Sequence, residues 1–364
     1  MRAAVWYGAK DLRVEEVPAV PPGLGEVTIE VAYCGICGSD LHEYADGPHA
    51  IPVGAPHPES GVAAPLVLGH EFCGTVTEVG GGVDGVVPGD RVAVEPHYRC
   101  GSCPRCLAGE YNICRHFGFA GLMGHGGLAE RATVPAYMLH RLPERVSLEQ
   151  AAVFEPAAVA LHAVRRARIR AGETVAVLGL GPIGLLVTQL AARYGAGRVV
   201  AADRSGARRE LALRLGAADA GADLADVVGG EGADVVFEAV GSEDTLRACL
   251  AATRRGGRVM FLGLTGTVRV DAFALVNNEQ TIMTSVGYRD AYPELIRLVA
   301  EEGVDLTRIV TSTIALDDVV RDGFEALLRR DEEQIKVLVR PGAAPGTGEQ
   351  AGVDGGCRAV RPVT

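Results

Sequence analysis

Between residues 173 and 286 the sequence alternates short apolar runs with helical segments, and this alternation restricts the possible folds more than any other feature. Strands that are separated by helices in this way form a parallel sheet with helices on both faces. We therefore predict a doubly wound α/β domain in this part of the chain. Its predicted strands are 174–178, 198–202, 234–237, 258–262 and 281–286, and its predicted helices are 183–194, 207–215 and 245–252.

A glycine motif joins the first of these strands to the first helix, and it reads Gly179-Leu-Gly181-Pro-Ile183-Gly184. In dinucleotide-binding folds the first glycine permits a tight turn and the second lets the backbone approach a pyrophosphate. The third lets the helix pack closely on the strand. We therefore predict that this segment, Ile183 included, binds a dinucleotide. The alternative is that the glycines only make a tight turn in another doubly wound fold.

Asp203 ends the second predicted strand, roughly twenty residues after the glycine motif, which is the spacing of the acid that binds ribose. A carboxylate there accepts hydrogen bonds from both ribose hydroxyls of NAD and repels the 2′-phosphate of NADP. Arg208 is expected along the adenine side, whereas Arg204 is a residue type that can receive a 2′-phosphate. The acid predicts NAD as the cofactor.

The rest of the chain divides around this domain. Residues 1–155 contain short β-prone runs split by Pro and Gly, namely 3–7, 12–17, 27–34, 74–79, 91–95 and 130–134. Ser147 is a predicted helix start, and a helix is expected over 156–169. After Tyr288 we expect helices over 293–301 and 317–330 and a lone strand over 335–339. Residues 289–340 should return to the β-rich domain, and the Gly- and Pro-rich tail 341–364 is expected to be disordered.

Four cysteines lie close together in the sequence, with the spacing Cys100-x2-Cys103-x2-Cys106-x7-Cys114. Four thiolates close a tetrahedral zinc site with no open position, and such a site stabilises a loop that lacks its own core. An iron–sulfur cluster or unligated thiols are the alternatives. The iron–sulfur alternative is weakened because no second cysteine-rich segment accompanies this one.

A second group of potential metal ligands is dispersed over the sequence. It comprises Cys37, the pair His70-Glu71, and Glu155 at the predicted domain junction. A catalytic zinc ion uses about three protein ligands and keeps one position open, which suits ligands from distant segments. Cys34 and Cys37 could also form a redox pair, but no thioredoxin-like strand and helix surround them. We predict a catalytic zinc site here.

Charge and cysteine usage limit the partners and the compartment. The chain has 46 acidic and 35 basic residues, a net charge of −11, which disfavours binding to nucleic acid. Residues 174–192 are uncharged, but their central glycines suit a strand, a turn and a helix better than a membrane span. The nine cysteines are clustered and odd in number, which fits metal ligation in a reducing compartment. We expect a cytoplasmic protein that does not associate with membranes.

In order, the motifs Cys37-Gly-Ser39-Asp40-Leu-His42, Gly69-His70-Glu71, the four-cysteine loop and the glycine motif resemble those of zinc-dependent medium-chain dehydrogenases. The segments 39–48, 51–65, 95–100 and 125–127 resemble the 2,3-butanediol dehydrogenase branch of that family. The resemblance covers residues 1–340. It implies a GroES-like catalytic domain over 1–155 and 289–340, a Rossmann domain over 156–288, and a homodimer or homotetramer.

The resemblance also implies roles for individual residues. Cys37 and His70 correspond to catalytic zinc ligands, while Glu71 and Glu155 correspond to two carboxylates, of which either one can ligate. Ser39 corresponds to the hydroxyl that passes on the substrate proton, and His42 to the base at the outer end of that relay. Asp40 is expected to contact a residue that binds the catalytic zinc ion, without binding the ion itself. The four clustered cysteines correspond to the structural zinc ligands.

The activity that the resemblance implies is hydride transfer between NAD and a small secondary alcohol or its ketone, such as 2,3-butanediol and acetoin. Sorbitol-type relatives carry a basic residue just before the tyrosine that corresponds to Tyr288, and here Gly287 stands in that place. This difference favours a smaller substrate. The alternatives are a sorbitol, threonine or other secondary-alcohol dehydrogenase, or a non-catalytic relative that only binds the cofactor.

Overall fold

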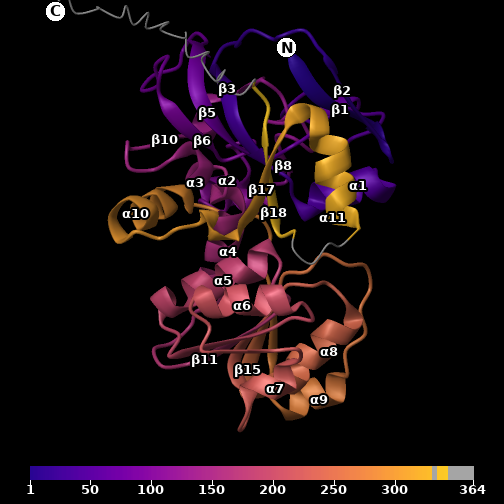
Figure 1. The fold of residues 1–364 in the computed structure, drawn as a ribbon, viewed down its shortest axis with the longest axis vertical. Helices are drawn as coiled ribbons and strands as arrows, with labels where there is room; N and C mark the ends of the chain where they lie inside the picture. The colour runs from indigo at the N-terminus through magenta and orange to yellow at the C-terminus, as the bar shows by residue number, and fades with distance from the viewer. Residues whose placement is uncertain (330–333, 343–364) are drawn as a thin grey trace, which may run out of the picture.

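The computed structural model describes residues 1–329 and 334–342, which form two lobes, each built on a sheet of its own (Figure 1). In the upper lobe of Figure 1 lies a seven-stranded sheet of order β10-β6-β5-β3-β18-β17, with β9 also paired to β3. A three-stranded sheet of order β2-β1-β4 and the hairpin β7-β8 complete its strands. In the lower lobe, a six-stranded parallel sheet has the order β13-β12-β11-β14-β15-β16. The predicted fold class, a β-rich domain joined to a doubly wound parallel sheet, is confirmed.

The strands of the β-rich lobe are β1 (Arg2–Gly8), β2 (Asp11–Glu16), β3 (Glu26–Gly35), β4 (Leu66–Val67), β5 (Glu71–Val79), β6 (Arg91–Val94), β7 (His97–Tyr98), β8 (Gly118–Phe119), β9 (Arg131–Pro135), β10 (Leu139–Arg141), β17 (Val310–Ala315) and β18 (Lys336–Arg340). Its helices are α1 (Gly38–Asp46), α2 (Pro104–Leu107), α3 (Leu148–Ala151) and α11 (Glu325–Leu328). As predicted, the Ser147 side chain caps α3, since its oxygen accepts a hydrogen bond from Gln150 N.

The parallel sheet contains β11 (Thr174–Leu178), β12 (Arg198–Ala202), β13 (Asp219–Gly221), β14 (Ala233–Glu238), β15 (Thr253–Phe261) and β16 (Thr281–Thr284). The helices that accompany it are α4 (Phe154–Ala167), α5 (Pro182–Ala191), α6 (Gly206–Arg214), α7 (Leu224–Val228), α8 (Glu243–Ala252) and α9 (Ala272–Asn277). Helix α10 (Tyr292–Glu302) packs against α4 beside the β-rich lobe (Figure 1). The alternation of apolar runs predicted the bounds of β11 and β12 correctly. It missed β13, α7 and α9, which are three to six residues long.

Two predictions for the C-terminal segment are wrong. The segment supplies two strands, not one, because β17 pairs in parallel with β18, and β18 pairs with β3. The segment expected as one helix from 317 onwards is a 3-10 turn (Leu316–Asp318), a π-helical turn (Val319–Phe324) and the short α11. A Cβ atom on Gly323 would lie 2.6 Å from Ile36 Cδ1, so this glycine allows the irregular turn to pack closely. The tail 343–364 lies outside the described residues.

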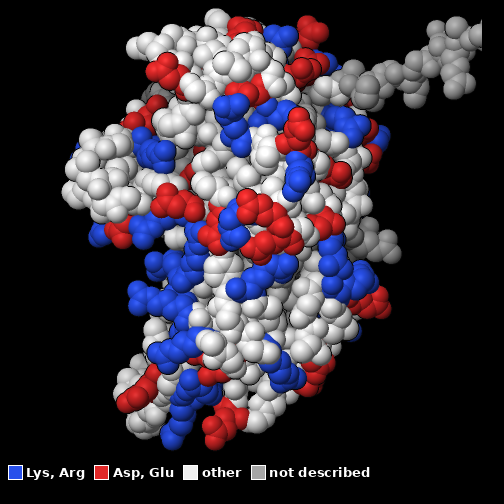
Figure 2. Space-filling model, turned by 90° about the vertical axis from the view of Figure 1, so that its left-hand side faces the viewer, with Lys and Arg blue, Asp and Glu red and all other residues white. Residues whose placement is uncertain are grey.

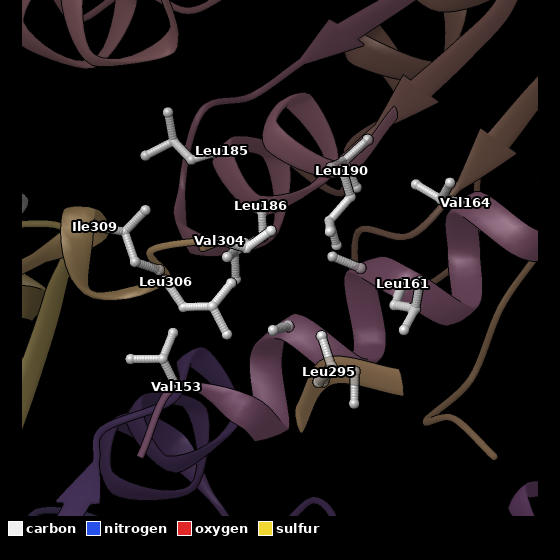
Figure 3. Close-up of a cluster of buried hydrophobic side chains, with 14 of the residues drawn as sticks. Val153, Leu161, Val164, Leu185, Leu186, Leu190, Leu295, Val304, Leu306 and Ile309 are labelled. Carbon is white, nitrogen blue, oxygen red and sulfur yellow. The ribbon is translucent and has the colours of Figure 1, made fainter. Parts of the chain in front are cut away.

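A buried apolar cluster joins the two lobes where α4, α5 and α10 meet (Figure 3). Val153 and Leu161 from around α4 face Leu186 and Leu190 of α5, and Leu295 of α10 closes the group. All five side chains are buried. Because the interior of a protein is close-packed, this cluster holds Glu155, which lies on α4, at a defined place between the lobes.

The surface charge is unevenly distributed. On the face shown in Figure 2, basic side chains gather over the lower half, whereas acidic and basic side chains mix over the upper half. The net charge of −11 is therefore not spread uniformly over this face. Among the residues that the structure describes, no helix combines the length and the apolar character needed to cross a bilayer.

Candidate active site

Cys37 lies directly before α1, so that Ser39, Asp40 and His42 all belong to this helix. Asp40 is fully buried, and its Oδ2 accepts a hydrogen bond from Cys37 N at 2.9 Å. Its other oxygen, Oδ1, lies 3.2 Å from His70 Nδ1. One buried carboxylate thus orients both the cysteine backbone and the imidazole ring. It leaves the Nε2 edge of His70 free to face a metal ion.

His70 and Glu71 stand at the start of β5, opposite the end of β3. Gly35 pairs with Glu71 across these strands, and a Cβ atom on Gly35 would lie only 2.0 Å from Glu71 Oε2. A glycine is therefore required at this position to make room for the carboxylate. Ligand atoms of Cys37, His70 and Glu71 all lie within 4.8 Å of one another. Thiolate, imidazole and carboxylate are the donor set that zinc uses, so these residues fit the metal that the sequence predicted.

Lys336 of β18 is a site residue that the sequence analysis missed. Its side chain is buried, and Nζ donates hydrogen bonds to both carboxylate oxygens of Glu71, at 2.8 and 2.7 Å. A third hydrogen bond goes to the backbone oxygen of Ile36 at 3.0 Å. Burial alone would lower the pKa of Lys336, but the charges of Glu71 and Cys37 raise it. A lysine within the apolar run Ile-Lys-Val-Leu-Val was the available signal, because a buried lysine needs a partner.

Glu155 lies in the first turn of α4, beside this group but not part of it. The residue is buried, and burial together with the charge of Glu71 raises the pKa of Glu155 to about 7. His70 and Lys336 act in the opposite direction. Unlike Glu71, Glu155 accepts no hydrogen bond from Lys336. A carboxylate that is buried in this way needs a cation or a proton.

Ser39 and His42 lie at increasing distance from the group. Ser39 Oγ is 3.4 Å from His70 Nε2, close enough to contact a molecule bound at the cysteine and histidine. His42 is exposed on the outer side of α1, and its ring lies 6.4 Å from that of His49. The first part of α1 therefore carries two residues that can carry a proton, Ser39 next to the buried group and His42 in contact with solvent.

The four clustered cysteines come together in the loop between β7 and β8. Ligand atoms of Cys100, Cys103, Cys106 and Cys114 lie within 4.8 Å of one another. Backbone N–H groups of Ser102 and Cys103 stabilise the thiolate of Cys100 and lower its pKa to about 5. All eight cysteines of the described residues are free of disulfides. The loop thus presents four sulfur ligands without an open position, which fits a structural zinc ion.

The glycine motif lies between β11 and α5, where each glycine has a distinct environment. Gly179 has a φ of +91°, a left-handed conformation that a side chain would strain. A Cβ atom on Gly184 would lie 1.8 Å from Gly179 O, so only glycine lets the helix approach the strand. A Cβ atom on Gly181 would meet nothing within 4 Å, so open space adjoins its backbone. Ile183 packs against the core at the junction of the lobes.

A groove of about 1140 Å³ runs along the carboxyl ends of β11, β12 and β14. It is lined by Gly179, Gly181, Asp203, Arg204 and Arg208 among others, whereas Ile183 and Gly184 lie outside its lining. This is the edge at which doubly wound sheets bind nucleotides. The groove therefore has the position and the donors for a dinucleotide.

Two backbone N–H groups hold the Asp203 carboxylate in place. Its Oδ2 accepts a hydrogen bond from Leu180 N at 2.7 Å, and its Oδ1 accepts one from Ser205 N at 2.9 Å. Arg208 reaches across to the C-terminal segment, where it donates a hydrogen bond to Gln334 O at 3.2 Å. The acid is thus positioned at the groove, and Arg208 links the groove to the β-rich lobe.

Comparison with known proteins agrees with this arrangement. Residues 23–144 match the family model described as alcohol dehydrogenase GroES-like domain, and residues 182–301 match zinc-binding dehydrogenase. The chain is 40% identical to the (R,R)-butanediol dehydrogenase of Bacillus subtilis over 351 residues, which are 94% of this chain and 100% of that protein. It is 33% identical to a sorbitol dehydrogenase of the same organism, with 94% and 97% of the two chains covered.

Solved structures of dehydrogenases are similar to this chain over nearly its whole length. The crystal structure of 2R,3R-butanediol dehydrogenase from Bacillus subtilis superposes with a TM-score of 0.87 at 39% identity, covering 94% of this chain and 99% of that one. An alcohol dehydrogenase of Escherichia coli, complexed with the cofactor NADH, gives a TM-score of 0.84 at 28% identity with the same coverage. This chain belongs to the zinc-dependent medium-chain alcohol dehydrogenase family, in its butanediol dehydrogenase-like branch.

Proposed function

We propose that this protein is a zinc- and NAD-dependent dehydrogenase that interconverts (R,R)-2,3-butanediol and acetoin. The observation that carries the proposal is the 40% identity to a butanediol dehydrogenase over that protein's full length. The convergence of Cys37, His70 and Glu71 beside the junction of the lobes supports it. NAD bound in the groove would accept the hydride from an alcohol carbon held near this group.

We assign the catalytic metal to Cys37, His70 and one carboxylate. Lys336 already pairs with Glu71, whereas Glu155 is buried without a hydrogen-bonded cation, so a metal ion would stabilise its carboxylate and we assign it as the third protein ligand. Glu71, held by the lysine, then balances the charge near the metal. These residues would hold a zinc ion, which would supply Lewis-acid polarisation of the alcohol oxygen and ease the loss of its proton. The four clustered cysteines hold a second, structural zinc ion.

We assign proton transfer to residues of α1 and cofactor binding to residues of the groove. Ser39 takes the proton of the alcohol, and the exposed His42 delivers it to solvent. Asp40 fixes the orientation of His70 and does not exchange protons with the substrate. Asp203 selects NAD by binding its ribose hydroxyls, and Arg208 lies along the adenine side.

Sorbitol oxidation is the second candidate, because a sorbitol dehydrogenase is also similar to the chain. Gly287 argues against it. A Cβ atom on Gly287 would lie 3.1 Å from Phe117 Cζ and 3.3 Å from His97 Nε2, so the wall beside it is closely packed. A side chain at this position would crowd those rings, so the chain lacks the basic residue that sorbitol-type relatives carry there and offers a longer polyol one polar contact fewer.

A substrate panel decides between these candidates. Initial rates are measured with NAD and with NADP for (R,R)-, meso- and (S,S)-2,3-butanediol, sorbitol, threonine and 2-butanol. We expect the highest kcat/KM for (R,R)-2,3-butanediol with NAD. A higher value for sorbitol or threonine would refute the assigned substrate, and turnover of none of the alcohols would leave a non-catalytic relative. Preference for NADP would refute the role of Asp203, whose replacement in Asp203→Gly should reduce discrimination between the cofactors.

We further propose a homodimer or homotetramer in the cytoplasm, with the domain bounds given above. β16 is an edge strand of the parallel sheet, and Phe273 and Val276 of the adjacent α9 are 79% and 73% exposed. An open strand edge beside exposed apolar side chains suits pairing with a second copy. The variant Phe273→Asp should lower the molar mass measured by light scattering, and an unchanged mass would exclude this surface.

A further inference from the structure

A ring of aromatic side chains surrounds His97, which lies on β7 next to the proposed zinc ligands. The ring centroid of His97 is 4.1 Å from that of Tyr288, 4.8 Å from Phe119 and 4.9 Å from Phe117. Phe119 in turn lies 5.5 Å from the ring of His70. Only one aromatic ring therefore separates His97 from a proposed ligand of the metal.

Three polar side-chain atoms of this aromatic group make no hydrogen bond within the described residues. His97 is 1% exposed, and neither of its ring nitrogens makes a hydrogen bond with the described residues. The hydroxyl of Tyr288, which is fully buried, is likewise unpaired there. Buried polar groups in folded proteins almost always have partners. Two adjacent residues whose polar atoms lack them point to a bound molecule that supplies the hydrogen bonds.

Glu95 determines which nitrogen of His97 carries the proton. Glu95 Oε2 lies 2.8 Å from His140 Nε2, and Glu95 Oε1 lies 3.6 Å from His97 Nδ1. Burial opposes ionisation of Glu95, but the two histidines outweigh it and hold the pKa of the carboxyl well below its usual range. Burial lowers the pKa of His97, so this imidazole is neutral. A carboxylate beside Nδ1 favours the proton on that nitrogen and leaves Nε2 as an acceptor.

The acceptor nitrogen faces Gly287. A Cβ atom at position 287 would come within 3.3 Å of His97 Nε2, so any side chain there would crowd the nitrogen. Glycine leaves this edge of the ring open. Tyr288, which follows directly, packs against His97, and burial, together with the charges of Tyr292 and Glu155, raises the pKa of its phenol. His97 and Tyr288 therefore lie near Glu155.

We propose that His97 Nε2, with the Tyr288 hydroxyl beside it, binds the oxygen of the substrate that is not oxidised. This inference rests on the proposed function and names a specificity-determining residue for it. An acceptor nitrogen requires a hydroxyl as its partner. The unreacted oxygen is a hydroxyl in butanediol and in acetoin, but a carbonyl in a diketone, and a mono-alcohol has none. His97 thus selects vicinal diols and α-hydroxy ketones.

The test compares wild type with His97→Phe, which keeps an aromatic ring in the stack and removes both nitrogens. Rates are measured for (R,R)-2,3-butanediol against 2-butanol, and for acetoin against diacetyl. We expect kcat/KM for the diol to fall roughly 10- to 100-fold, while that for 2-butanol changes by at most about threefold. The acetoin-to-diacetyl ratio should fall by a similar factor, because only acetoin donates a hydroxyl proton to Nε2.

The variant His57→Phe is the matched control. His57 is a partly buried histidine whose ring lies 5.7 Å from Tyr98 of the same strand β7, and one of its nitrogens is also unpaired among the described residues. It should leave both substrate ratios unchanged. Unchanged ratios in His97→Phe would overturn the inference, as would an equal loss with butanediol and 2-butanol, which indicates a purely structural role. A wild-type preference for sorbitol would refute the proposed substrate instead.

Discussion

The two groups of metal-type ligands are assembled in opposite ways. The four cysteines between Cys100 and Cys114 belong to one loop, and their sulfur atoms are surrounded by backbone N–H groups. Cys37 and the pair His70-Glu71 come from two separate segments, and buried charged side chains surround them. A local group can close around an ion by itself. The dispersed group depends on the whole lobe, and this lets it keep an open position for chemistry.

The two groups of ligands also differ in how the charges around them are balanced. At the dispersed group, Lys336 holds Glu71, Asp40 faces His70, and Glu155 stands nearby. These side chains are buried, so each charge must be balanced by another or by the metal. The cysteine loop has no such network among the described residues. Substitutions should therefore affect activity at the dispersed group and stability at the loop.

The largest expected effect comes from Cys37→Ser. Loss of the thiolate removes the catalytic zinc ion, so kcat for butanediol should fall by at least about 10³-fold, while NADH binding is retained. Zinc content by mass spectrometry should drop by about one ion per subunit. Cys249 is a buried cysteine on α8 outside the two ligand groups. The control variant Cys249→Ala should therefore keep the wild-type kcat and the wild-type zinc content. Undiminished zinc with normal kcat in Cys37→Ser would refute the assignment.

The next effect concerns the lysine. Lys336→Met leaves Glu71 buried without a partner, so the free energy of unfolding should fall by about 3–5 kcal/mol. The double variant Lys336→Met/Glu71→Gln removes both charges and should recover part of this loss. Denaturant unfolding of the four proteins in a double-mutant cycle measures the coupling. Additive effects would show that the pair contributes nothing beyond its two members.

A smaller effect is expected at the cysteine loop. Cys106→Ser should weaken the structural zinc site and lower Tm by about 5–10 °C, because the loop then loses its metal crosslink. The kcat of the folded fraction should stay within about threefold of wild type. Scanning calorimetry and initial rates on the same sample provide the measurement. A kcat loss as large as that of Cys37→Ser would abolish the distinction between the two groups.

The smallest effect concerns the path from the open site to solvent. His42→Ala should reduce kcat for alcohol oxidation by roughly tenfold, since water must then accept the proton directly. His49→Ala is the matched control, because this exposed neighbour lies 6.4 Å away and has no part in the proposed relay. Steady-state rates at saturating NAD compare the two. Equal losses in both variants would contradict a specific role for His42.

Local sequence signals predicted the fold better than they predicted the site. The bounds of β11, the glycine motif after it and the Ser147 cap depend on neighbouring residues only, so they could be recognised in the sequence. α1, which carries Ser39 and His42, was not among the predicted helices. β17 was missed although its β-branched run, Val-Thr-Ser-Thr-Ile, is typical of a strand.

Contacts between distant segments could not be predicted in this way. Glu71 and Lys336 are far apart in the sequence, and they meet only because β18 returns to pair with β3. The environment of His97 likewise depends on Tyr288, which lies beyond the whole parallel sheet in the sequence. The candidate ligand types were visible in the sequence, but our proposed choice between Glu71 and Glu155 rests on the position of Lys336.

Anomalous X-ray diffraction at the zinc absorption edge, from crystals of protein purified without added metal, tests the central claim most directly. We predict two peaks per subunit. One should lie about 2.3 Å from Cys37 Sγ and about 2.1 Å from His70 Nε2, and the other should lie among the four clustered cysteines. A single peak at the cysteine loop, with none between Cys37 and His70, would contradict the proposal that this enzyme uses zinc to oxidise its substrate.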